Sequence, residues 1–140
     1  MTDLIRKEHT YQHSIDRVWK AITDQEQIAA WFIKADFKPE KGYAYTFTHE
    51  QTTISGTVLE VNPVTHLVYT WTVSGTSGVE TTVTWQLSPV PEGTHVVIEH
   101  SGISKYPDEG LVTTMFNNYS KGWDNCILGL EKYLKEVAHA

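Results

Sequence analysis

The hydrophobic period of the chain changes from helical to two and back to helical, and this order restricts the folds that the chain can adopt. From about Tyr43 to Leu87, apolar and polar residues alternate with a period of two, as in strands with one buried face and one solvated face. From about Asp108 to Ala138, apolar residues recur at helical spacing instead. Strands followed by one long helix predict an α+β domain, with the helix packed on one face of an antiparallel sheet.

Four segments carry the strand-like alternation, and a first strand is expected earlier, at Leu4 to Gln12. The four segments are 43–48, 52–61, 67–73 and 79–87. Turn residues are found at 62–63, 75–78 and 89–93. The segment 52–61 changes phase between Val58 and Leu59, and Gly56 lies nearby. We therefore expect Gly56 to mark a bulge that helps to curve the sheet.

Two short helices are expected near the N-terminus. Ser14 has the character of an N-cap, and Asp16 follows in the first turn, where the helix dipole favours an anion. Asp24 and Gln27 resemble a capping box for a second helix, which carries Trp31 on its apolar stripe.

The apolar residues of the last segment form an unusually wide face. Their arc spans roughly 160°, compared with ~100° for an ordinary surface helix. Gly122, Cys126 and Gly129 lie along one edge of this arc, where small residues either let the sheet approach or leave empty space. Asn118 and Gly122 are poor helix formers, so a break near 118–120 is an open alternative.

Length and composition exclude several classes of protein. The 140 residues suit one domain, 1–140, and the single cysteine, Cys126, excludes an internal disulfide. No apolar window approaches the ~18 residues of a membrane span, and no signal peptide is visible, so we expect a cytoplasmic protein without membrane insertion. Between Gly42 and Ser104 there are five glutamates but no lysine or arginine, which argues against nucleic-acid binding.

The seven histidines do not form a metal-binding pattern. None is spaced as His-x-x-x-His, and no Cys–His cluster is present, so we predict no metal site and no cofactor. His100 shares a strand face with Ile98, and His49 shares one with Phe47, so two imidazoles could enter an apolar cavity. As an acid and a base they would permit catalysis, but no nucleophile motif accompanies them and we assign no catalytic residue.

Large aromatic side chains lie on the expected buried faces of both the strands and the last helix. Such residues can fill a core completely, or a curved sheet spanned by one helix can leave a hollow, and both alternatives stay open. Apolar pockets of roughly 300–1,000 Å³ are the usual sites for small molecules. The residues expected to line such a pocket are Trp31, Phe32, Phe47, Trp71, Trp85, His100, Met115, Tyr119 and Trp123. Among these, His100 is the expected polar anchor.

The stretch SIDRVWKAITDQEQIAAWF resembles the N-terminal signature of the START-like (SRPBCC) superfamily. More narrowly, the chain resembles stand-alone bacterial members of one of its families, that of the C-terminal domain of the activators of the heat-shock protein 90 ATPase. Further matching segments are SGTVLEVNPVTHLVYTW, VTWQLSP, THVVIEHSG and KGWDNCILGLEKYL. The resemblance implies a helix-grip, birch-pollen-allergen-like fold: a curved antiparallel sheet wrapped on a long C-terminal helix, with two short helices near the N-terminus. It also implies a cavity that in relatives holds lipids, sterols, hormones or polyketides.

Three functions follow from these observations. The first is binding of a small hydrophobic or aromatic molecule between the last helix and the sheet. The second is a stress-related co-chaperone or protein-interaction module. Eukaryotic co-chaperones of this family carry an additional N-terminal domain for which this chain has no room, which argues against a direct chaperone-activating role but leaves a chaperone partner as an alternative. The third is a cavity enzyme, such as a cyclase or hydratase. We favour binding over catalysis.

Overall fold

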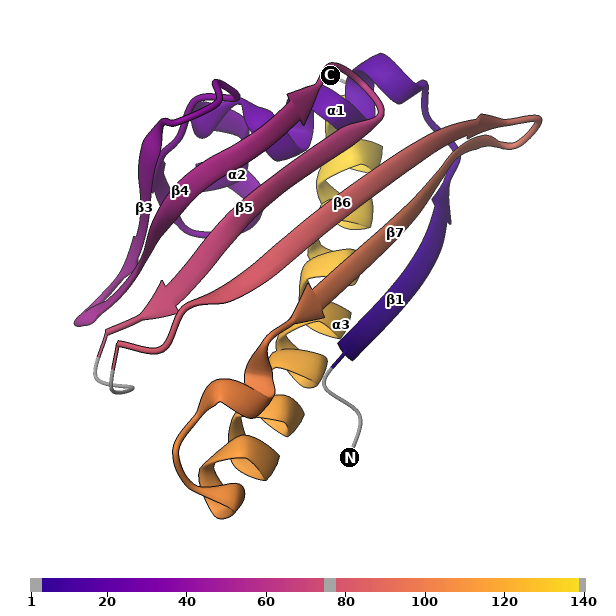
Figure 1. The fold of residues 1–140 in the computed structure, drawn as a ribbon. Helices are drawn as coiled ribbons and strands as arrows, with labels where there is room; N and C mark the ends of the chain where they lie inside the picture. Colours follow the sequence, from indigo (N-terminus) through magenta and orange to yellow (C-terminus); the bar gives the residue numbers. More distant parts are fainter. Residues whose placement is uncertain (1–3, 75–77, 139–140) are drawn as a thin grey trace.

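The computed structural model describes residues 4–74 and 78–138, so most of the turn expected at 75–78 lies outside the described residues. The elements are β1 (Leu4–Tyr11), α1 (Ile15–Thr23), α2 (Gln25–Trp31), β2 (Lys34–Asp36), β3 (Ala44–His49), β4 (Thr52–Asn62), β5 (His66–Val73), β6 (Thr81–Val90), β7 (Gly93–Ser101), the 3-10 helix η1 (Ile103–Lys105) and α3 (Glu109–Ala138). Across the described part of the chain, the strands form one antiparallel sheet in the order β1-β7-β6-β5-β4-β3-β2. This sheet curves around α3, and α1 and α2 lie on the same side of it (Figure 1).

The two short helices share a capping residue. The Arg17 N–H donates to Ser14 Oγ at 3.3 Å, as expected for the N-cap of α1. The Asp24 N–H donates to the Lys20 carbonyl at the end of α1, and the Asp24 carboxylate accepts from the Glu26 N–H at 3.4 Å at the start of α2. One residue therefore ends the first helix and begins the second, which directs α2 toward β2 and α3.

The bulge in β4 lies three residues after the glycine that was expected to mark it. The pairing of β4 with β5 shifts register between Val58 and Glu60, which matches the change of phase seen in the sequence at Leu59. Gly56 has a different role. A Cβ at Gly56 would lie 2.1 Å from the Thr70 carbonyl oxygen, so a glycine is needed there because β5 approaches closely.

The last helix, α3, is continuous over thirty residues, so the alternative of a break near 118–120 is wrong. The apolar face of α3 explains this continuity, because tertiary packing outweighs the low helix propensity of Asn118 and Gly122. The fully or nearly buried residues of this face are Val112, Met115, Trp123, Ile127, Leu130 and Leu134. Leu128, on the opposite face, is 62% exposed.

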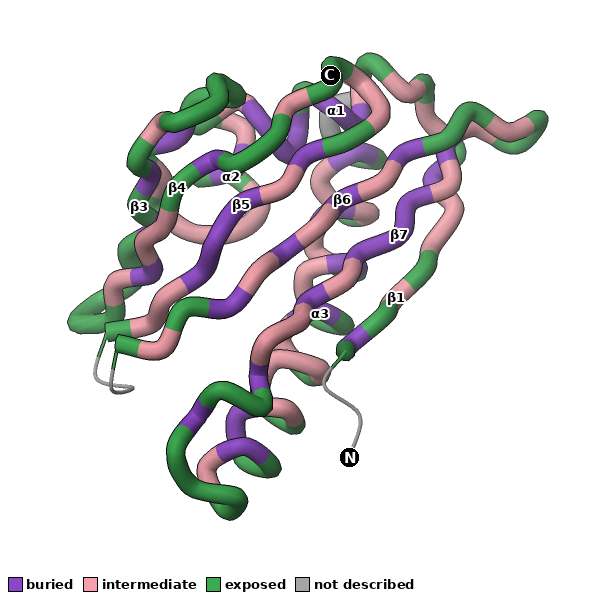
Figure 2. Tube along the Cα trace, in the orientation of Figure 1, coloured by how far each residue is buried: buried purple, intermediate pink, exposed green. Residues whose placement is uncertain are grey.

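Side chains from every layer meet between the sheet and α3. Buried and less buried positions alternate along β6 and at the start of β5 (Figure 2), which fits strands with only one face in the core. The sequence did not reveal β2, because three residues are too few to show an alternation. A curved antiparallel sheet around a long C-terminal helix, with two short helices near the N-terminus, is the helix-grip fold that the resemblance implied.

Candidate functional site

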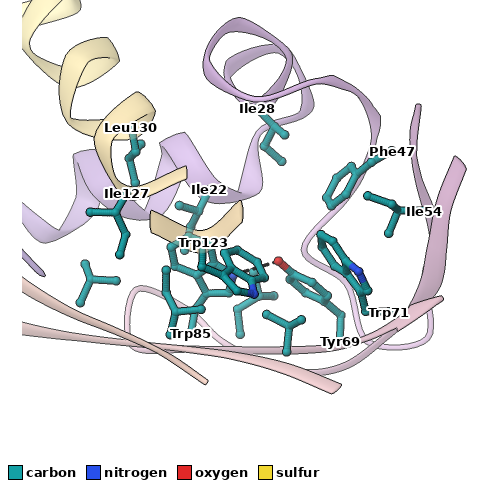
Figure 3. Close-up of a cluster of buried hydrophobic side chains, with 14 of the residues drawn as sticks. Ile22, Ile28, Phe47, Ile54, Tyr69, Trp71, Trp85, Trp123, Ile127 and Leu130 are labelled. Carbon is teal, nitrogen blue, oxygen red and sulfur yellow. Dashed lines mark hydrogen bonds between the residues drawn. The ribbon is translucent and has the colours of Figure 1, made fainter. Parts of the chain in front are cut away.

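An aromatic cluster lies where α3 faces the middle of the sheet. Trp71 of β5 and Trp123 of α3 have ring centroids 5.4 Å apart, and Trp123 meets Trp85 of β6 edge-on at 5.9 Å. Phe32, directly after α2, packs against Phe47 of β3 at 5.6 Å. In Figure 3, Trp85 and Trp123 lie close together beside the hydroxyl of Tyr69, and Trp71 lies next to the Tyr69 ring. Four elements thus contribute rings to one region of the core.

Two adjoining hollows are found in this cluster, and we call them the inner void and the open pocket. The inner void has a volume of about 10 Å³, enough for roughly one water molecule. Its lining residues are Ile22, Ile28, Trp31, Phe32, Phe47, Tyr69, Trp71, Trp85, Trp123 and Cys126. The open pocket has a volume of about 90 Å³ and is lined by Phe32, Trp71, Asn118, Tyr119, Gly122, Trp123 and Cys126. Phe32, Trp71, Trp123 and Cys126 line both hollows and therefore form the partition between them.

The small residues of α3 have two different roles at the edge of these hollows. A Cβ at Gly122 would have no atom within 4 Å, so this glycine leaves open space. A Cβ at Gly129 would lie 3.3 Å from the Trp31 carbonyl oxygen, so that glycine permits close approach of the end of α2. The sequence left these two explanations open, and each applies to one glycine.

His100 is completely buried and both of its ring nitrogens are occupied. The Trp123 indole N–H donates to Nδ1 at 3.0 Å, which requires Nδ1 to be unprotonated. The hydroxyl of Thr81 donates to the Trp71 carbonyl at 3.0 Å and lies 2.7 Å from His100 Nε2. Nε2 must then carry the proton and donate to Thr81 Oγ1. With the proton on Nε2, the neutral imidazole has a hydrogen-bond partner at each nitrogen, and the Trp123 N–H and the Thr81 hydroxyl both have acceptors.

Burial lowers the pKa of His100 to about 3, because the charged imidazolium would lose its hydration. At neutral pH this histidine is uncharged, and it offers no free nitrogen to a substrate or ligand. His49 lies at the end of β3 and is exposed. The expectation that both imidazoles enter one cavity is therefore wrong, and the pair expected to act as acid and base is not assembled.

The indole N–H of Trp71 has no hydrogen-bond partner, although Trp71 is only 6% exposed. The other tryptophans that line the inner void all have acceptors. Trp31 donates to the Ala21 carbonyl at 2.7 Å, Trp85 to the Tyr69 hydroxyl at 2.8 Å, and Trp123 to His100. Buried polar groups are normally paired, so the Trp71 N–H is an exception that calls for an explanation.

Tyr119 forms one side of the open pocket. Its ring stacks on His100 with centroids 4.5 Å apart, and its hydroxyl lies 2.7 Å from that of Tyr106. Burial, and then the hydrogen bond with Tyr106, raise the pKa of Tyr119, whereas the neighbouring Trp71 N–H acts in the opposite direction. The Trp71 N–H is thus close to the Tyr119 oxygen, but the two groups do not have hydrogen-bond geometry.

The structure places most of the predicted lining residues beside a hollow. Those that do line one are Trp31, Phe32, Phe47, Trp71, Trp85, Tyr119 and Trp123. Met115 and His100 are buried but line neither hollow. The sequence did not assign Tyr69 or Cys126 to the lining, although strand alternation with Trp71 and the helical arc placed both on buried faces. Burial raises the pKa of the Cys126 thiol to about 12, which makes it an unreactive apolar lining group.

The described residues give no indication of a metal or of a membrane span. No group of three or more His, Cys, Asp or Glu residues within 4–74 and 78–138 could hold a metal ion. Among the helices that the structure describes, none is long and apolar enough to cross a membrane.

Comparison with known proteins identifies the family. The chain matches the family model described as Activator of Hsp90 ATPase homolog 1-like protein over residues 12–135. No curated protein matches it. Among solved structures, MLL2253 from Mesorhizobium loti has 27% identity and a TM-score of 0.85, covering 95% of this chain and 97% of that one. BH1534 from Bacillus halodurans has 25% identity and a TM-score of 0.76, with coverage of 94% and 96%. As the sequence indicated, the chain belongs to the Activator of Hsp90 ATPase homolog 1-like family of the START-like (SRPBCC) superfamily.

Proposed function

We propose that the chain binds a small, mainly aromatic molecule between α3 and the sheet. The observation that carries this proposal is the open pocket, which is lined mostly by aromatic rings and separated from the inner void only by side chains. A ligand that displaces this partition would join the two hollows into one apolar site. Flat ligands are favoured, because the surrounding rings offer stacking and edge-to-face contacts.

Binding requires the pocket to enlarge. Ligand pockets typically measure about 300–1,000 Å³, whereas the open pocket measures about 90 Å³. Phe32 is only half-buried at its rim, so a change of its rotamer disturbs less packing than displacement of a buried ring. The space beside Gly122 gives room for this movement. Movement of the Phe32 ring, which belongs both to the rim and to the partition, would enlarge the open pocket toward the inner void.

Titration of intrinsic tryptophan fluorescence tests the proposal, with a panel of neutral aromatic compounds. Trp71 and Trp123 line both hollows, so a bound ligand should change their emission in a saturable way. Gly122→Leu should abolish this response while leaving the fold intact, because the new side chain points into the pocket. The matched control is Asn125→Leu, which adds the same side chain to an exposed position of α3. No response to the panel in the wild-type protein, or equal responses in both variants, would contradict the proposal.

A further inference from the structure

We propose that the ligand carries an uncharged hydrogen-bond acceptor, such as a ketone or other neutral carbonyl oxygen, that binds the Trp71 N–H together with the Tyr119 O–H. This inference rests on the proposed function and specifies the chemistry of the ligand. It replaces the polar anchor that the sequence assigned to His100, whose nitrogens already have partners within the protein.

The Trp71 N–H is buried and unpaired. It is the one buried side-chain nitrogen or oxygen, among the described residues, that lacks a hydrogen-bond partner. Trp31, Trp85 and Trp123 show that this cluster otherwise satisfies its indole donors. A buried donor without an acceptor is unfavourable, and an acceptor supplied by a ligand removes that penalty. The Trp71 N–H of the free protein is therefore available to donate a hydrogen bond to a ligand.

The neighbours of this donor indicate its direction. Trp71 and Tyr119 both line the open pocket. Trp71 meets the His100 ring at a centroid distance of 5.7 Å and Tyr119 stacks on the same ring at 4.5 Å, so the two side chains lie beside one imidazole. The Trp71 N–H also acts to lower the pKa of Tyr119, as expected for a donor on the Tyr119 side of the pocket. In the free protein the bond with Tyr106 raises the pKa of Tyr119, as for a Tyr119 hydroxyl that donates. Either hydroxyl of the pair can be the donor, so the bond can reverse when a ligand oxygen reaches Tyr119. The Tyr119 proton is then free, and a carbonyl oxygen with two lone pairs can accept from both groups.

The residues that line the two hollows carry no charge. No Lys, Arg, His, Asp or Glu is among the residues that line either hollow. His100 lies behind Tyr119 as a neutral imidazole, and the Cys126 thiol stays protonated. A carboxylate or an ammonium group would lose its hydration here without gaining a counter-charge. The site therefore favours a neutral acceptor over a fatty-acid carboxylate or a cation.

Three naphthalenes of nearly equal shape test this inference. They are 2-acetylnaphthalene, with a neutral carbonyl; 2-isopropenylnaphthalene, with a methylene group in place of the oxygen; and 2-naphthoate, with an anionic carboxylate. Dissociation constants come from ¹H–¹⁵N correlation spectra of the indole N–H groups. We expect the ketone to bind roughly tenfold tighter than the isopropenyl compound, as for a hydrogen bond to an otherwise unpaired donor. The carboxylate should bind most weakly, and only the ketone should shift the Trp71 indole proton downfield.

Variants then connect the preference to its two donors. In Trp71→Phe, the ratio of the two affinities should fall to about one, and in Tyr119→Phe it should fall partway. Because the readout is a ratio, a general weakening of the pocket cancels. If Trp71→Phe does not fold, the half-buried Tyr119→Phe variant and the wild-type Trp71 resonance still give the answer. Equal binding of the ketone and the isopropenyl compound, or tightest binding of the carboxylate, overturns this inference. The proposed function, binding of an aromatic molecule in the pocket, would still stand. No binding of any of the three overturns both proposals.

Discussion

Three hydrogen bonds in series cross the core at His100. Trp123 of α3 donates to His100 of β7, His100 donates to Thr81 at the start of β6, and Thr81 donates to the carbonyl of Trp71 in β5. Trp123, His100 and Thr81 each donate one hydrogen bond to the next group in the series, which requires His100 to be a neutral imidazole with its proton on Nε2. A second proton on His100 would face the Trp123 N–H and break the first bond. The main role of His100 is therefore to connect the last helix with three strands.

The buried state of His100 predicts a specific dependence of stability on pH. Its pKa is about 3 in the folded protein, compared with 6.5 for an ordinary histidine side chain. Between these values the unfolded chain binds a proton that the folded chain does not, so the folded protein loses stability as pH falls from about 6.5 toward 3. From pH 7 to pH 4.5 the loss from this residue should be roughly 2–3 kcal/mol.

The control for this prediction is His100→Gln, whose amide can accept from Trp123 and donate to Thr81 without titrating. Urea unfolding of both proteins at pH 7 and pH 4.5 gives the difference due to His100, because the remaining groups titrate alike in both proteins. The same pH dependence in wild type and variant would show that the imidazole does not resist protonation in the fold.

At the scale of single elements, α3 combines rigid packing with local space. Leu130 and Leu134 are fully buried, and Gly129 lies against the end of α2. About two turns earlier, toward the N-terminus, the side of the helix at Gly122 faces empty space. The pocket thus opens at Gly122, where the helix carries no side chain. The part of the helix from Gly129 to Leu134 is packed against the rest of the core.

Two glycine substitutions on α3 should have different effects on stability. Gly122→Ala should raise the free energy of unfolding by about 0.5–1 kcal/mol, because alanine favours the helix and its methyl group meets no atom. Gly129→Ala gains the same propensity but brings its methyl group to 3.3 Å from the Trp31 carbonyl oxygen, so the two effects should nearly cancel. Chemical denaturation of the two variants measures both values. An equal gain at both positions would show that Gly129 does not mark a close approach.

The elements show which parts of the structure were predictable from sequence and why. Alternation and helical period located the main strands and α3, because each depends on the local sequence. The alternative of a break near 118–120 is wrong, because helix propensity is weaker than the packing of residues such as Trp123. The inward direction of His100 followed from its phase with Ile98. The hydrogen-bond partners of His100 could not be predicted, because Thr81 and Trp123 lie far from it in sequence and are brought to it by the tertiary fold. The unpaired state of Trp71 likewise depends on where all other acceptors lie.

For the molecule as a whole, the same aromatic cluster has to provide both a core and a site. Trp123 contacts Trp71, Trp85 and His100, so it joins the helix to the sheet. It also forms part of the partition between the two hollows. A residue with only the first role would affect stability when it is truncated, whereas a residue with both roles would also affect ligand binding.

Truncation at two positions of α3 separates these roles. Trp123→Ala should lower the free energy of unfolding by about 3–5 kcal/mol, the range for a large buried aromatic residue. It should also weaken binding of 2-acetylnaphthalene severely, because it removes a wall shared by both hollows. Leu130→Ala, at a completely buried position that lines neither hollow, should cost about 2–5 kcal/mol. Its affinity should be unchanged when it is measured on the folded fraction. Equal losses of affinity in the two variants would mean that binding follows overall stability, and that Trp123 belongs to the core alone.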